Sequence, residues 1–75
     1  MRYSTGQDIR EGDEVWLEAR AMPGMVVKVV LPGTLEAREW AAPDGGVLIE
    51  REELGLALAT HPERDHNLVL IRRSR

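Results

Sequence analysis

Gly24-Met25-Val26-Val27-Lys28-Val29-Val30-Leu31 is the stretch of sequence that decides the fold. Four of its eight residues are valines. Valine packs well on the pleated surface of a sheet and loses rotamer freedom in a helix. The stretch therefore predicts a β-strand over residues 24–31. Pro-Gly is a turn signal, so Pro23 and Gly24 predict a hairpin turn over residues 20–24, with a partner strand over residues 13–20.

The rest of the chain repeats this pattern of short apolar runs separated by glycine and proline, which is typical of a small all-β fold. Three more strands are predicted over residues 47–51, 56–60 and 68–72. For residues 50–59 a helix is an alternative, because leucine and alanine are indifferent strand formers. Gly55 in the middle of that segment favours two strands joined by a turn over residues 52–55.

Residues 34–42 interrupt the strands with helix-forming side chains between two prolines. They predict a helix of one to two turns, capped by Gly33 or Thr34. Asp44-Gly45-Gly46 then predicts a tight turn. Residues 62–67 predict a polar loop before the last strand.

Together these elements predict one all-β domain over residues 1–75, with about five antiparallel strands and one short helical insertion. A sheet of this size hides its edges by curling into a barrel. Ile9 is expected to plug its end. The side chains expected to face the interior are Val15, Leu17, Met25, Val27, Val29, Val47, Ile49, Leu56, Leu58, Val69 and Ile71.

The order of two motifs resembles the SH3-like barrels of the KOW type. In this chain they are Ile9-Arg10-Glu11-Gly12-Asp13-Glu14-Val15 and the stretch Pro23 to Val30. The resemblance covers about a third of the chain and implies an SH3-like barrel, but it specifies little about function, because this barrel is reused widely. The longer opening, residues 3–15, is similar to small stand-alone bacterial proteins, some of which act as immunity proteins paired with toxins. That second resemblance implies an inhibitor.

Charge and composition exclude several classes of protein. Ten Lys and Arg residues stand against thirteen Asp and Glu, for a net charge of −3. A dedicated nucleic-acid binder usually has a basic excess, and KOW proteins bound to ribosomes are basic, so this balance argues against RNA as the ligand. The absence of cysteine excludes disulfides and thiolate metal sites. No signal peptide and no apolar run long enough for a bilayer are found, and a cytoplasmic location is expected.

Two clusters of titratable residues have the side chains that a chemical site could use. His61, Glu63, Asp65 and His66 have the residue types of a zinc site, but their spacing and Pro62 favour a solvated polar loop. Glu50, Glu52 and Glu53 are neighbouring carboxylates with no nucleophile beside them, which favours a charged hairpin tip. We therefore expect no catalytic residues, no metal and no cofactor, and the protein is predicted not to be an enzyme.

The outward face of the predicted sheet says more about function than these clusters do, because it combines exposed valines with a tryptophan. If Val27 and Val29 point inward, Val26 and Val30 flank Lys28 on the outside, and Trp16 lies outward on the neighbouring strand. In one interpretation, the helical insertion covers this apolar face through Leu35 and Trp40 as a second small core. In the other, the face binds a partner or a second copy of the chain.

The sequence thus predicts a non-enzymatic module that binds a protein, in its most concrete form an inhibitor that blocks a toxin. Carboxylates around a tryptophan would meet an electropositive cleft. The alternatives are an RNA-associated KOW-like domain and a small homodimeric structural protein. The candidate partner-binding residues are Trp16, Val26, Lys28, Val30, Glu36, Glu39 and Trp40.

Overall fold

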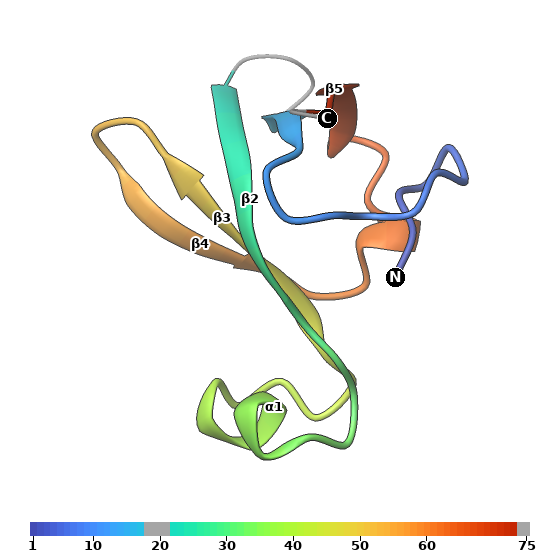
Figure 1. Cartoon of the computed structure of the whole chain (residues 1–75), viewed down its shortest axis with the longest axis vertical. Coiled ribbons are helices and arrows are strands. Elements are labelled where there is room, and N and C mark those ends of the chain that lie inside the picture. Colours follow the sequence, from blue (N-terminus) through green and yellow to red (C-terminus); the bar gives the residue numbers. More distant parts are fainter. Residues whose placement is uncertain (18–21, 74–75) are drawn as a thin grey trace.

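The computed structural model describes residues 1–17 and 22–73 as one twisted sheet with a short helix at one end (Figure 1). The strands are β1 (Glu14–Leu17), β2 (Met22–Val30), β3 (Gly46–Arg51), β4 (Gly55–Ala59) and β5 (Val69–Arg72). The helix α1 spans Leu35–Glu39, and a 3₁₀ turn, η1, spans Pro62–Arg64. The predicted all-β class, with five antiparallel strands and one short helix, is confirmed.

The strand order is β4-β3-β2-β1-β5, and every neighbouring pair is antiparallel. The sheet is not closed into a barrel, so the expectation of closure is wrong. In the described residues, β4 pairs only with β3 and β5 only with β1, which leaves two sheet edges. A hollow of about 230 Å³ lies between β4 on one side and Leu17, Met22 and the loop residues Asp65 and Asn67 on the other.

Most of the predicted elements are present at their predicted places. The valine-rich stretch forms β2, and residues 50–59 form a hairpin rather than a helix. Thr34 caps α1, where its Oγ1 accepts a hydrogen bond from the Ala37 backbone N–H at 3.1 Å.

The predicted Pro-Gly turn is wrong, because both residues lie inside β2. Pro23 is opposite Trp16 and Gly24 is opposite Val15. A Cβ on Gly24 would come within 2.7 Å of Ile49 Cγ2, so the missing side chain serves close packing inside the strand rather than a turn. The connection from β1 to β2, with the last residues of the predicted strand 13–20, falls on residues 18–21, outside the described part of the chain.

The main core lies on one face of the sheet, between the strands and the N-terminal segment (Figure 1). Ile9 is buried in it, as expected. Its buried members are Tyr3, Ile9, Val15, Val26, Val47, Ile49 and Leu68.

The predicted inward set is wrong in part, because before the bulge β2 faces the main core with Val26 rather than with Met25 and Val27, whereas Val29 packs on the main core as expected. Val26 is 1% exposed in the main core, while Val30 lies on the opposite face, as expected, and is fully buried there. Val26 pairs with Ile49 and Lys28 pairs with Leu48, so β2 has one extra residue at this point. Such a bulge shifts the alternation of side chains between the two faces. Four residues expected inside are instead exposed: Met25, Val27, Leu56 and Ile71.

A second small core lies on the opposite face, under α1. Its buried residues are Val30, Ala37 and Leu48, with Leu58 packed against them. The helical insertion therefore does cover part of this face, as one of the two interpretations expected. It does so through Ala37, while Leu35 is 70% and Trp40 42% exposed.

Candidate functional site

The helix covers only one end of this second face, and the other end is open. Arg72 of β5 pairs with Glu14 of β1, Glu14 with Met25 of β2, and Met25 with Glu50 of β3. These residues form one row across four strands. The open end is hollowed into a pocket of about 510 Å³, which we call the open sheet pocket. Its lining residues are Glu14, Pro23, Gly24, Met25, Glu50, Glu52, Ile71 and Arg72.

Exposed apolar side chains form part of this pocket. Met25 is 44% exposed and Ile71 is 42% exposed, and Pro23 beside them is exposed as well. Covering these three side chains would be favourable, since removing apolar surface from water contributes about 25 cal/mol of free energy per Å². Covering this apolar surface of the pocket would therefore release free energy.

Local irregularity of the strands shapes the pocket. Gly24 also lines the pocket, while the position of its missing side chain lies on the core face, against Ile49. The pairing of β1 with β5 shifts by one residue, because Val15 is opposite Leu70 while Glu14 is opposite Arg72. Ile71 is the extra residue of this irregularity, and it lines the pocket. Irregularities of this kind re-aim side chains and are enriched near functional sites.

Two of the charges at the pocket already neutralise each other. The Arg72 guanidinium donates to both carboxylate oxygens of Glu14, through Nε to Oε2 and through Nη2 to Oε1 at 3.4 Å. This hydrogen bonding lowers the pKa of Glu14 and raises the pKa of Arg72. Glu50 and Glu52 form no ion pair with any residue in the described ranges. The lining residues supply carboxylates, a guanidinium and apolar groups, but no hydroxyl, thiol or imidazole.

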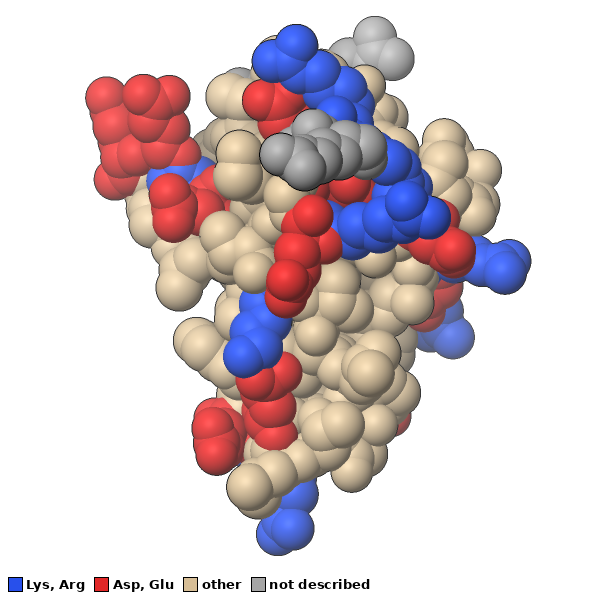
Figure 2. Space-filling view, in the orientation of Figure 1, with Lys and Arg blue, Asp and Glu red and all other residues tan. Residues whose placement is uncertain are grey.

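Four of the sequence-predicted partner residues lie together at the α1 end. Lys28 forms an ion pair with Glu36, and this hydrogen bond, with the charge of Glu39, raises the pKa of Lys28. Trp40 follows Glu36 by four residues and so shares one flank of the helix with it. In Figure 2, acidic (red) and basic (blue) groups alternate from the top of the molecule to the bottom. A broad uncharged (tan) surface lies beside them in the lower part of the picture.

The other three predicted partner residues lie elsewhere. Val26 and Val30 belong to the two cores, so neither is available to a partner. Val26 faces the main core because β2 has the opposite phase before its bulge, and Val30, on the opposite face, is covered by α1. Trp16 is half-buried on β1, opposite Pro23 of the open sheet pocket. The open sheet pocket was not predicted from the sequence. The feature that pointed to it is the pair of carboxylates Glu50 and Glu52, which lie two positions apart at the end of a strand.

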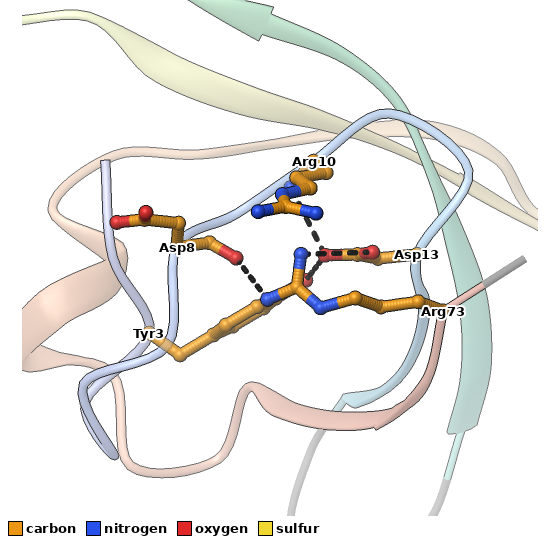
Figure 3. A network of polar contacts seen from close by, with 5 residues as sticks. All are labelled: Tyr3, Asp8, Arg10, Asp13 and Arg73. Atoms are coloured by element: carbon orange, nitrogen blue, oxygen red, sulfur yellow. Dashed lines mark hydrogen bonds and ion pairs between the residues drawn. The ribbon is translucent and has the colours of Figure 1, made fainter. Parts of the chain in front are cut away.

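A second feature that the sequence did not predict is a buried polar network around Asp13 (Figure 3). The Tyr3 hydroxyl donates to Asp13 Oδ2 at 2.6 Å, and the Arg10 backbone N–H donates to the same oxygen at 3.0 Å. Arg73 Nη1 lies 3.7 Å from Asp13 Oδ1, while its Nη2 donates to the Asp8 carbonyl at 2.5 Å. Burial and the hydrogen bond to Asp13 raise the pKa of Tyr3. The network joins the N-terminal segment to the chain just after β5.

His61, in the polar loop before β5, has two acidic neighbours. His61 Nδ1 lies 3.6 Å from Glu63, and Nε2 lies 3.9 Å from Asp44. No group of three or more metal-ligating side chains is found among residues 1–17 and 22–73.

Two general findings complete the description. Neither helical segment within the described ranges has the length and apolar character needed to cross a bilayer. Comparison with protein-family models, with curated proteins and with solved structures finds no match to this chain.

Proposed function

We propose that this protein is a non-catalytic module that binds another protein through the open sheet pocket. The observation that carries the proposal is the pocket itself, in which Met25 and Ile71 stand exposed between charged side chains. An apolar centre inside a polar rim is the usual anatomy of a protein-binding hot spot.

The charge of the chain supports an electropositive partner. The net charge is −3, and the pocket contributes Glu50 and Glu52 without compensating cations in the described residues. Charge of this sign speeds association with a basic surface and disfavours phosphate-rich ligands. The most concrete form of the proposal is the one that the resemblance to immunity proteins implies, an inhibitor that covers the basic cleft of a toxin. The SH3-like resemblance stays part of this proposal.

A capture experiment with matched variants tests the function. The tagged protein, a Met25→Asp variant and a Leu35→Asp control are exposed to an extract of the organism that encodes them, with chemical crosslinking. Leu35 is even more exposed than Met25 but belongs to α1. Circular dichroism and thermal unfolding first establish that both variants fold. We expect one specific protein to be retained by the wild type and by Leu35→Asp, and its affinity to fall about 30-fold or more for Met25→Asp, the scale of a hot spot.

Two outcomes would contradict the proposal. The first is that the wild type retains no protein. The second is that Met25→Asp retains the partner while Trp40→Ala loses it, which would move the contact surface to the α1 end. In that case Glu36→Lys together with Glu39→Lys would mainly slow association, because rim charges steer the encounter.

A further inference from the structure

The chemistry of the open sheet pocket also indicates what the partner inserts there, an inference that rests on the proposed function. Three glutamates and one arginine line the pocket. Because Arg72 is already engaged by Glu14, the charge left for a ligand is that of Glu50 and Glu52. The pocket is therefore acidic toward any group that enters it.

The apolar and acidic parts of the pocket are adjacent. Met25 lies directly opposite Glu50 in the pairing of β2 with β3, and Glu52 follows β3 in the hairpin turn. A ligand lying on Met25 thus has a carboxylate at its end. The ligand that fits is an apolar stem with a cationic tip, and lysine and arginine side chains have this form.

Other side chains fit the pocket less well. An aspartate or glutamate would meet two like charges. A leucine would bury Met25 but would also desolvate the Glu50 carboxylate without giving it a partner, which costs free energy. Arginine is favoured over lysine, because its planar guanidinium donates several hydrogen bonds to carboxylates at once. The pocket, at about 510 Å³, has room for one such side chain and part of the peptide that carries it.

We propose that the open sheet pocket receives a basic side chain, arginine in preference to lysine, from an exposed segment of the partner protein. The aliphatic stem lies on Met25 and Ile71, and the guanidinium is held by Glu50 and Glu52.

The test uses defined peptides and backbone amide NMR. The probes are an acetylated, amidated pentapeptide with arginine between two glycine pairs, and the same peptide with citrulline, which keeps the shape and removes the charge. We expect the arginine peptide to bind with millimolar affinity at low salt and to shift the amides of Gly24, Met25, Glu50 and Ile71. The citrulline peptide should shift them at least about fivefold less at the same concentration, the scale of lost exposed ion pairs.

Matched double variants locate the charge that matters. Glu50→Gln with Glu52→Gln should weaken the arginine peptide about five- to tenfold. Glu36→Gln with Glu39→Gln removes the same charge from the α1 end and should leave the affinity unchanged. Equal binding of the citrulline peptide, or shifts confined to α1, would overturn the proposal.

The experiments distinguish a failure of the basic-side-chain proposal from a failure of the proposed function. If the arginine peptide leaves the pocket amides unshifted while Met25→Asp still abolishes capture of the partner, the basic side chain is wrong and the proposed function stands. If the peptide binds at the pocket while capture survives Met25→Asp, the pocket accepts arginine but is not where the partner binds.

Discussion

Asp13 shows how much of this small protein depends on a few buried polar atoms. Its side chain is 1% exposed and accepts hydrogen bonds from Tyr3 and from the Arg10 backbone. The ion pair with Arg73 connects Asp13 to the residue that directly follows β5. A buried carboxylate is tolerated only when it is paired and hydrogen-bonded, so the three partners are required together.

Replacing Asp13 by alanine should lower the free energy of unfolding by about 3–5 kcal/mol, because the Tyr3 hydroxyl and the Arg73 guanidinium would be left without their partner. Asp8→Ala is the control, since the Asp8 side chain is exposed and, within the described part of the chain, forms an ion pair with Arg2 alone. It should cost less than about 1 kcal/mol. Urea unfolding measures both variants. Equal stability of the two would show that the Asp13 network contributes nothing beyond a surface ion pair.

Tyr3 gives a pH dependence with a defined sign. Burial raises its pKa in the folded protein, so the folded state holds the neutral phenol that donates to Asp13. The contribution of this group to stability is complete below the unfolded pKa, about 10, and decreases as pH rises above it. We expect the free energy of unfolding to fall more steeply above about pH 10 in the wild type than in Tyr3→Phe.

Tyr3 is the single tyrosine of the chain, so phenolate absorbance reports it directly. The absorbance of the folded protein should stay flat through about pH 10 and rise only with unfolding. A phenolate signal that titrates near pH 10 in the folded protein would contradict the buried network.

At the scale of elements, the short helix α1 depends on its cap. A helix of five residues has too few internal hydrogen bonds to be stable alone. Thr34 Oγ1 accepts from the Ala37 N–H and donates to the Leu31 carbonyl at 2.8 Å, so one hydroxyl joins the end of β2 to the first turn. Ala37 then packs on Val30 and Leu48.

Thr34→Ala should therefore destabilise the protein by about 1 kcal/mol, the usual cost of a lost cap. Thr34→Ser keeps the hydroxyl and should stay within a few tenths of a kcal/mol of the wild type. Chemical unfolding of the two variants side by side measures the difference. If serine costs as much as alanine, the methyl group and not the cap is what matters.

At the scale of the whole molecule, the open sheet leaves β4 as an edge strand, which pairs with β3 alone among the described residues. The strand reads Gly-Leu-Ala-Leu-Ala, has no charged side chain, and exposes Leu56. Natural proteins usually guard such edges with lysine, proline or a covering loop. We expect this edge to pair with a second copy of the chain, which would form the homodimer that the sequence leaves open.

Leu56→Lys should reduce self-association at high concentration, because a charged side chain on an edge strand disfavours pairing between copies. Leu54→Lys introduces the same charge and removes an equally exposed leucine in the hairpin turn outside the strand, and it should leave association unchanged. Sedimentation at several concentrations measures both. A wild type that stays monomeric at all of them would refute this prediction.

The sequence alone determined the elements of this protein. The valine runs of β2 and the Gly and Pro residues between runs act over a few positions, so the strands and α1 with its Thr34 cap could be predicted. Gly55 correctly favoured the β3–β4 hairpin over a helix. The turn predicted at Pro23-Gly24 is wrong, because this dipeptide favours a turn but also fits inside a strand. In β2, Ile49 packs closely against Gly24, which has no side chain to obstruct it.

Only the tertiary structure decided which face each strand buries and whether the sheet closes. The bulges at Val26–Lys28 and at Glu14–Val15 arise from pairing between distant strands, and one extra residue moves every following side chain to the other face. The Asp13 network and the open sheet pocket join residues up to about sixty positions apart. No local pattern in the sequence encodes such a meeting, because it depends on the register of the whole sheet.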